Sequence, residues 1–302
     1  MKRFFILLII CISPLFAYSQ IPQFGFLPKG YETLDSTALR VFYEFTYPPT
    51  MKLVKRPAIM SVEDSLKQAK STDYMVLEIG RTGISKFYSD NKRVVDSLIM
   101  DLMENPQQKA PMFQEKFKNS GIQKADNREI FKNYPQGKMT VIDQVGTNAL
   151  SYEDDLSGVQ WQITTDTMTC LNYLCQKATG DFRGRHYEAW FAPDLPVNDG
   201  PWKFFGLPGL ILYVTDSNHQ YILKAVALDK MQTPLQFAKR DYIKTTRQEA
   251  DKMQKRFAED PLGYTMNSFN PGAPIPQSVP DGQGGTISRE DMKMTYNPME
   301  LE

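Results

Sequence analysis

Three residues of this chain have the types needed for nucleophilic catalysis, namely Cys175, His186 and Asp194. A thiol nucleophile needs a base within hydrogen-bond reach, and the base needs a group that orients it. Cys175 and His186 fall on successive predicted strands, so they could meet across a hairpin. The alternative is a small buried thiol and a polar residue on the sheet face, because unpaired cysteines are among the residues most often buried. The three residues are therefore weak catalytic candidates, and we favour the structural interpretation.

Metal-binding and acid–base patterns are weaker still. The imidazole and thiol groups of His186, His219, Cys170 and Cys175 match neither a CxxC nor an HExxH spacing. We therefore predict no metal site and no cofactor. The adjacent acids Glu153–Asp155 have the residue types of a glycosidase carboxylate pair, but such runs at a strand end usually form a solvated turn.

Aromatic side chains are concentrated between residues 161 and 205. Together with an arginine they could line a concave pocket for an apolar or peptide-like ligand. The six candidates for ligand binding are Trp161, Arg185, Tyr187, Trp190, Trp202 and Phe204. The alternative is that alternate rings fill the hydrophobic core, with Trp202 and Phe204 closing one end of the sheet. The pattern favours the core over the pocket.

The segment Asp199–Leu212 combines turn-forming residues with large apolar ones. Pro208 fixes its φ near −65° and Gly209 tolerates a positive φ, so Leu207–Leu210 is predicted to form a type II turn. The apolar residues that follow predict a strand. The structural signature of the segment consists of Gly200, Pro201, Gly206, Leu207, Pro208, Gly209, Leu210 and Ile211.

The run Gly-Leu-Pro-Gly-Leu-Ile resembles the hallmark of the GLPGLI family of exported Bacteroidota proteins. Further blocks are similar to that family and occur in the same order, at residues 85–89, 132–135, 173–178, 185–191 and 297–301. Cys170 departs from the family pattern. The resemblance implies an exported protein with a β-rich fold, and it implies no known catalytic residue or reaction.

The N-terminus has the pattern of a secretory signal peptide. Lys2 and Arg3 precede the apolar run Phe4–Ile12, and small residues at Ala17 and Ser19 predict cleavage after Ser19. The apolar run is too short to remain as a membrane anchor. We therefore predict an exported protein, periplasmic or secreted, with no membrane span after cleavage.

Composition excludes a nucleic-acid-binding role. The full chain carries 35 basic and 35 acidic residues, and removal of Lys2 and Arg3 leaves a net charge of about −2. Binding to nucleic acid requires a basic face, which this balance does not supply. The length predicts a single β-rich domain over residues 20–260, and the Pro, Gly, Asn and Ser content predicts an extended or partly disordered C-terminal tail over residues 261–302.

Alternating apolar residues and short turn clusters predict about ten strands. They are Arg40–Tyr47, Tyr74–Ile79, Ile84–Tyr88, Thr140–Val145, Ala149–Glu153, Val159–Thr164, Met168–Lys177, His186–Phe191, Leu210–Thr215 and Gln220–Leu228. Helices are predicted over Asp90–Met103, Pro111–Asn119 and Thr246–Glu259. Strands joined by short links pair antiparallel, so we predict a mainly β (α+β) fold: a strongly curved antiparallel meander sheet or half-barrel with one or two packed helices.

A disulfide between Cys170 and Cys175 is disfavoured by the predicted strand Met168–Lys177. Residues five positions apart on a strand lie about 17 Å apart. A disulfide requires Cα atoms within about 7 Å of each other. We therefore predict two separate thiols, unless a bulge or a turn interrupts this strand.

Two hypotheses for function remain. The first is a non-catalytic cell-envelope binding or scaffold protein, whose aromatic-lined concave sheet holds an envelope protein, a peptide or a lipid-like ligand. The alternative is an extracytoplasmic hydrolase that acts on peptide or glycan and uses Cys175, His186 and Asp194.

Overall fold

The computed structural model describes residues 28–48, 71–120, 126–280 and 285–301, and the predicted signal peptide lies outside them. The strands are β1 (Gly30–Tyr47), β2 (Ser71–Gly80), β3 (Ser85–Ser89), β4 (Glu129–Lys132), β5 (Lys138–Val145), β6 (Asn148–Asp155), β7 (Gln162–Cys170), β8 (Tyr173–Phe182), β9 (Arg185–Ala192), β10 (Leu210–Asp216), β11 (Ile222–Lys230), β12 (Pro234–Lys239), β13 (Tyr242–Lys244), β14 (Ser278–Pro280) and β15 (Thr286–Ser288). The helices are α3 (Asp90–Glu104), α4 (Pro106–Asn119), α5 (Arg247–Glu259), α6 (Pro261–Phe269) and the 3-10 helix η2 (Glu290–Met292).

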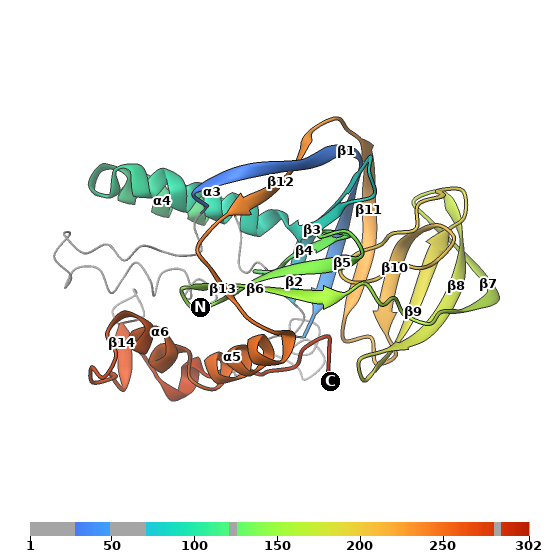
Figure 1. The fold of residues 1–302 in the computed structure, drawn as a ribbon. Coiled ribbons are helices and arrows are strands. Elements are labelled where there is room, and N and C mark those ends of the chain that lie inside the picture. The colour runs from blue at the N-terminus through green and yellow to red at the C-terminus, as the bar shows by residue number, and fades with distance from the viewer. Residues whose placement is uncertain (1–27, 49–70, 121–125, 281–284, 302) are drawn as a thin grey trace.

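One large sheet contains the strands from β1 to β13, and its order follows the chain in two runs (Figure 1). Strands β1 to β6 form the first meander, strands β7 to β11 form the second, and the antiparallel pairing of β1 with β11 joins the two. β12 continues alongside the first part of β1, and β13 pairs with β6 in the parallel direction. The predicted mainly β fold with an antiparallel meander sheet is therefore confirmed.

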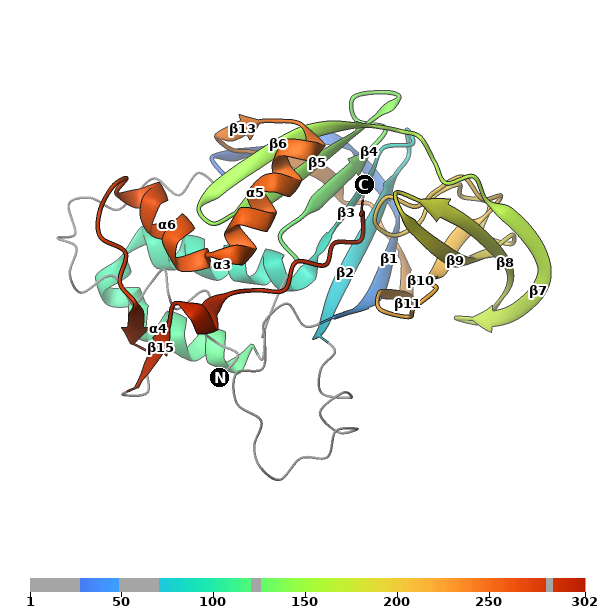
Figure 2. The same ribbon diagram turned by 90° about the horizontal axis from the view of Figure 1, so that it is seen from below.

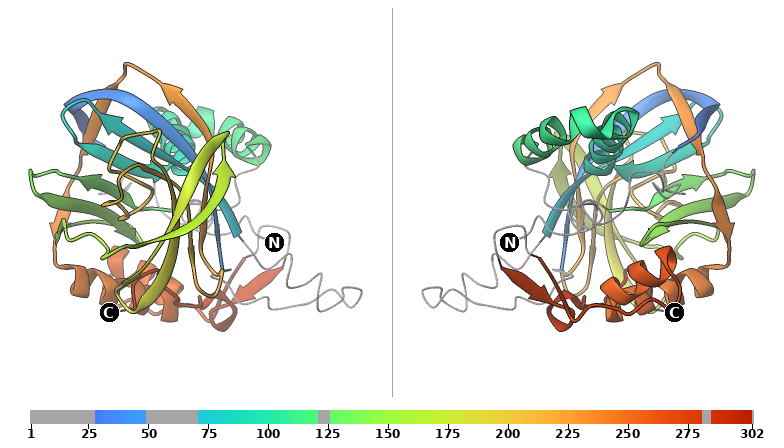
Figure 3. Two further views of the ribbon diagram at one scale, coloured as in Figure 1. Left: turned by 90° about the vertical axis from the view of Figure 1, so that its right-hand side faces the viewer. Right: turned by 90° about the vertical axis from the view of Figure 1, so that its left-hand side faces the viewer.

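Both faces of the first meander are covered. Alternate residues of β1 (Val41, Tyr43 and Phe45) are buried on the concave face, as the sequence pattern predicts. On the other face, Phe131 of β4 packs against Phe237 of β12, with ring centres 5.0 Å apart. The pair α3 and α4 and the pair α5 and α6 lie on opposite sides of this part of the sheet (Figure 3).

The concave face is filled by two segments that have no strand structure of their own. The loop at residues 193–209 buries Trp202, Phe204 and Leu207 in the main core. The C-terminal segment runs from η2 between the two halves of the sheet and buries Met299 in the same core (Figure 2). The interior of the curved sheet is therefore occupied by the chain itself.

The predicted strand Met168–Lys177 is wrong, because a turn divides it into β7 and β8. Leu171 and Asn172 have φ values of 47° and 67°, as the two central residues of a type I′ hairpin turn require. Asparagine adopts this conformation readily, whereas leucine does not, so only Asn172 indicates a turn at this position. The turn places Cys170 and Cys175 on adjacent strands of one hairpin.

The segment predicted as an extended tail begins with a helix instead. Pro261 is the first residue of α6, and the side chain of Asp260 caps the helix by accepting a 3.1 Å hydrogen bond from Gly263 N–H. Proline ends a helix that precedes it, but it is also favoured at the first position of the next one. Leu262, Val279 and Met292 then form a small core of their own.

The predicted type II turn at Leu207–Leu210 is wrong, although the strand that follows it is confirmed as β10. Gly209 N–H donates to Leu207 O over 2.8 Å, which closes a three-residue turn around Pro208. The positive φ values of this loop lie at Trp202, at 52°, and at Gly206, at 101°. Gly209 is needed for close packing instead, because a Cβ added there would lie 2.3 Å from Ala192 O.

We expect Gly209→Ala to lower the free energy of unfolding by about 3 kcal/mol, because the added methyl group forces β10 away from Ala192. The measurement is urea denaturation at neutral pH. Gly137→Ala is the control: Gly137 has a positive φ, 78°, which Gly209 does not, and a Cβ added there meets nothing within 4 Å. The control should lose only about 1 kcal/mol. Equal losses in the two variants would contradict a packing role for Gly209.

Candidate functional site

A buried ion pair fixes the start of the signature loop, residues 199–209, to the sheet. The ammonium group of Lys132, at the end of β4, pairs with the carboxylate of Asp199 and donates to Gly200 O over 2.5 Å. Only 5% of the Lys132 side chain is exposed. Burial lowers the pKa of Lys132, and the charge of Asp199 opposes that shift. The pair therefore holds the loop where it enters the core.

The loop aromatics and Tyr187 lie in the core. Tyr187 and Phe204 are fully buried, with ring centres 4.7 Å apart, and Trp202 lies 5.1 Å from Phe204. Trp161 packs at the edge of this group and donates its indole N–H to Phe205 O over 2.8 Å. These contacts support the core interpretation, and ligand binding by these residues stays a prediction.

The remaining two ligand-binding candidates occupy different places. Trp190 alternates with the core residues of β9, and the ammonium of Lys177 lies 5.9 Å from its ring centre. Arg185 is buried and donates two hydrogen bonds to Pro298 O, at 2.8 and 3.1 Å. Its other partners include Asn297 Oδ1 at 2.5 Å.

The C-terminal segment therefore lies where a peptide ligand was expected. Arg185 binds Pro298 O, and the hydroxyl of Tyr187 donates to Met299 O over 2.7 Å. Both side chains are used to recognise main-chain oxygens, as they would in a peptide-binding groove. The chain's own residues 297–300 thus satisfy the two polar groups that the sequence assigned to a ligand.

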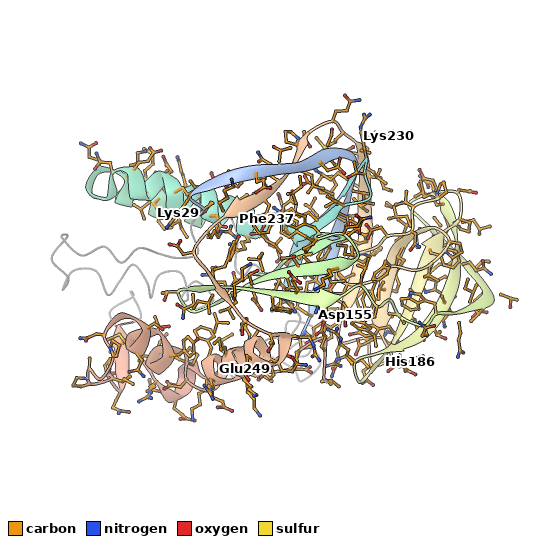
Figure 4. The ribbon with its side chains drawn as sticks, in the orientation of Figure 1. Lys29, Asp155, His186, Lys230, Phe237 and Glu249 are labelled. Carbon is orange, nitrogen blue, oxygen red and sulfur yellow. The ribbon has the colours of Figure 1, made fainter. Side chains whose placement is uncertain are left out.

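The weak catalytic candidates are not brought together. His186 lies at the exposed start of β9, and its Nδ1 is 2.8 Å from Asp181 Oδ1 (Figure 4). Cys175 is opposite Met168, six positions and about 20 Å along β8 from Asp181. Asp194 is exposed in the turn after β9. A thiol–imidazole pair between Cys175 and His186 is therefore excluded by the register of these strands.

A second buried network of charges joins five distant parts of the chain. Arg183, between β8 and β9, binds both carboxylate oxygens of Asp154 at 2.6 and 2.8 Å and reaches Glu300 at 2.8 Å. Lys203 of the signature loop pairs with Asp154 at 2.9 Å and also with Glu300. Arg247 of α5 lies 3.6 Å from Glu300. Burial alone would raise the pKa of Asp154, but hydrogen bonds from Arg183 and Lys203 outweigh it and lower the pKa to about 2.

Asp154, Arg183 and Arg247 of this network form the floor of a polar hollow with a volume of about 660 Å³. The hollow lies between the end of β6, the β8–β9 turn and the link from β13 to α5, near Asp155 (Figure 4). It is lined by Ser151, Tyr152, Glu153, Asp154, Asp155, Arg183, Lys244, Thr245, Thr246, Arg247 and Gln248. Its size is that of a small-ligand site, and its lining is dominated by groups that form hydrogen bonds.

Two buried carboxyl groups under the helices have strongly perturbed acidity. Burial raises the pKa of Asp143 to about 6, against the opposing charge of Arg128. Burial likewise raises the pKa of Asp73 to about 6, although Asp73 accepts hydrogen bonds from Ser89 and from the main chain of Asp126. Perturbed carboxyl groups of this kind are common at functional sites and also in structural networks.

Within the described ranges, no group of three or more His, Cys, Asp or Glu side chains is arranged to hold a metal ion. No helix among the described residues is both long and apolar enough to cross a membrane.

Comparison with known proteins supports the family resemblance. Residues 183–213 match the family model described as "Protein of unknown function (Porph_ging)", which confirms the predicted GLPGLI-type resemblance over the β8–β9 turn, the signature loop and β10. No curated protein matches the sequence.

Two solved structures of PNGF-II, from two crystal forms, are similar to this chain at TM-scores of 0.44 and 0.43, with 12% and 15% sequence identity. The matches cover 72% and 71% of this chain and 33% and 32% of the PNGF-II chains. The chain therefore spans about a third of the length of those chains.

The buried lysines Lys132 and Lys203 were not identified from the sequence as residues of the candidate site. Lys132 ends a run of apolar residues in β4, and its alternation with Ile130 places it on the concave face, a signal that was present in the sequence. Lys203 is the single charged residue among the glycines, prolines and aromatic residues at positions 200–209, which is a second signal of the same kind. Nothing in the sequence linked either lysine to its partner, because those partners come from distant segments.

Removal of the Lys132 cation should be strongly destabilising. We expect Lys132→Met to lower the free energy of unfolding by about 3–5 kcal/mol, since it leaves the Asp199 carboxylate buried without a positive charge beside it. Lys138→Met is the control, because Lys138 forms a half-exposed pair with Glu153 and should lose less than about 1 kcal/mol. A double-mutant cycle with Asp199→Asn measures the coupling. Additive losses in the cycle would contradict the ion pair.

Asp143→Asn should change the pH dependence of stability. The folded pKa of about 6 lies above the ordinary value of 3.8, so the folded state keeps a proton that the unfolded state releases. Asp143 therefore becomes destabilising as pH rises from about 4 to about 6, and that effect is constant at higher pH. Asparagine removes it, so the variant should gain up to about 3 kcal/mol relative to wild type between these pH values.

Urea denaturation of wild type and Asp143→Asn at several values between pH 4 and 8 tests this expectation. The difference between the two curves isolates Asp143, since Asp73 is unchanged in both proteins. A difference that is constant across this pH range would show that Asp143 titrates normally.

Proposed function

We propose that the protein is a non-catalytic, exported binding protein of the cell envelope that holds a polar peptide segment of a partner in the hollow beside the signature loop. The single observation that carries this proposal is the hollow itself, whose floor brings together charged side chains from three distant segments, Asp154, Arg183 and Arg247. A scaffold role in the envelope is compatible with the same contact.

The chemistry of the lining favours a peptide over a lipid-like ligand. Hydroxyl groups of Ser151, Thr245 and Thr246 and the carboxylates of Glu153 and Asp155 line the hollow. Among the described residues, Lys244 donates a weak 3.4 Å hydrogen bond to Ser151 Oγ and forms no ion pair. A peptide carries the donors, acceptors and charges of both signs that complement such a surface, whereas an acyl chain does not.

The architecture around the hollow is suited to an extended ligand. β13 lies at one end of the sheet order, and its last residue, Lys244, lines the hollow. An extended peptide can add its main chain to such an edge while its side chains reach the adjoining hollow. The ion pairs of the floor fix Arg183 and Asp154 before binding, which reduces the entropy lost when a ligand is ordered.

Binding to the purified mature protein tests the proposal. A library of fluorescent peptides that carry both acidic and basic residues is measured by anisotropy at low salt. We expect a subset to bind, and Lys244→Glu to weaken that binding by at least about tenfold, or 1.4 kcal/mol. Lys230→Glu is the matched control, because Lys230 is an exposed lysine at the far end of β11 (Figure 4).

Two outcomes would overturn the proposal. If Lys244→Glu and Lys230→Glu weaken peptide binding equally, the affinity depends on the net charge of the protein and not on the hollow. The alternative function is an extracytoplasmic hydrolase, and the raised pKa of Asp143, about 6, is in the range that suits a general acid or base. If the wild type hydrolyses peptide or glycan and Asp143→Asn does not, that result favours the hydrolase.

A further inference from the structure

The β7–β8 hairpin brings together the two cysteines that the polar hollow does not use. In its register Cys170 is opposite Tyr173 and Met168 is opposite Cys175. Residues opposite each other in an antiparallel pair share a face, so both thiols lie on the same face as diagonal neighbours. The turn residues Leu171 and Asn172 fix this arrangement through their positive φ values.

The two thiols have unequal environments. Both are free, but Cys175 is fully buried whereas Cys170 is partly exposed. A hydrogen bond between the two side chains lowers the pKa of Cys170 and raises that of Cys175, and the nearby charge of Lys224 lowers the pKa of Cys170 further. The accessible thiol is thus the more acidic one, and the buried thiol donates a 3.6 Å hydrogen bond to Tyr173 O.

We propose that Cys170 and Cys175 form a redox-active dithiol at the tip of the β7–β8 hairpin, which is oxidised reversibly by disulfides of small thiols or of exported proteins. Cys170 is the attacking thiol and Cys175 is the resolving thiol. This assignment differs from the nucleophile expected from the sequence, since the buried Cys175 acts second.

The exchange balances in two steps. The Cys170 thiolate attacks one sulfur of the external disulfide, which forms a mixed disulfide and releases one thiolate that takes up a proton. Cys175 then loses its proton and attacks the Cys170 sulfur, which releases the second external thiol. The two cysteines lose two electrons and two protons in total, and the external disulfide is reduced to two thiols.

The diagonal arrangement favours a reversible bond over a permanent structural one. A relaxed disulfide needs Cβ atoms about 3.8 Å apart, and diagonal neighbours across antiparallel strands lie farther apart than that. Closing the bridge must therefore draw the two strands together at the hairpin tip. Such a strained disulfide is reduced more easily than a relaxed one.

Oxidised glutathione is the probe for this exchange. The reduced mature protein is mixed with it, sampled over time, treated with a thiol-alkylating mass tag and analysed by intact mass. Wild type should lose both taggable thiols and retain no glutathione. Cys175→Ser should retain one glutathione on Cys170, and Cys170→Ser should react at least about tenfold more slowly because its remaining thiol is buried.

Thermal melting of each variant shows whether it is folded, and the wild-type time course gives an independent readout if a variant is not. In that course a single glutathione adduct should appear at Cys170 and then disappear as the internal disulfide forms. The proposal is overturned if wild type keeps two taggable thiols or accumulates stable adducts on both cysteines. Equal reaction rates of the two single variants would also overturn it.

Discussion

Ion pairs buried in the interior connect the parts of this molecule that hydrogen-bonded strands do not connect. Lys132 reaches from the first meander to the signature loop, and Arg183 and Lys203 meet Asp154 and Glu300 where the second meander, the loop and the C-terminal segment converge. Unpaired buried charges are strongly unfavourable, so each of these groups tolerates few positions of its partner. The pairs thereby select one arrangement of loop, sheet and C-terminal segment.

This constraint explains why the concave side of the sheet is not an open groove. The loop enters beside Asp199, carries Trp202 and Phe204 into the core and leaves at Gly209, where the absence of a Cβ permits contact with Ala192. The C-terminal residues occupy the remaining space and satisfy Arg185 and Tyr187. A site for an external molecule is consequently displaced to the rim, where the charge network meets solvent.

The two candidate sites lie on different parts of the sheet. The polar hollow adjoins β6 and β13, at one end of the strand order, whereas the cysteine hairpin β7–β8 forms the other end. The first is suited to recognition, because ion-paired side chains fix its geometry. The second is suited to electron exchange, because one thiol is accessible and the other is buried.

The sequence by itself determined the local features of this protein. Alternation in Val41, Tyr43 and Phe45 predicted the second half of β1, and the spacing of Thr246 and Glu249 predicted the start of α5, since both signals arise within one element. Tertiary structure alone decided which charges meet and which face is filled. Lys132 and Asp199 are 67 positions apart, and no local pattern encodes a pairing created by the closure of a curved sheet. The same holds for the cysteines, because the turn between β7 and β8 holds Leu171 at a positive φ that leucine itself disfavours.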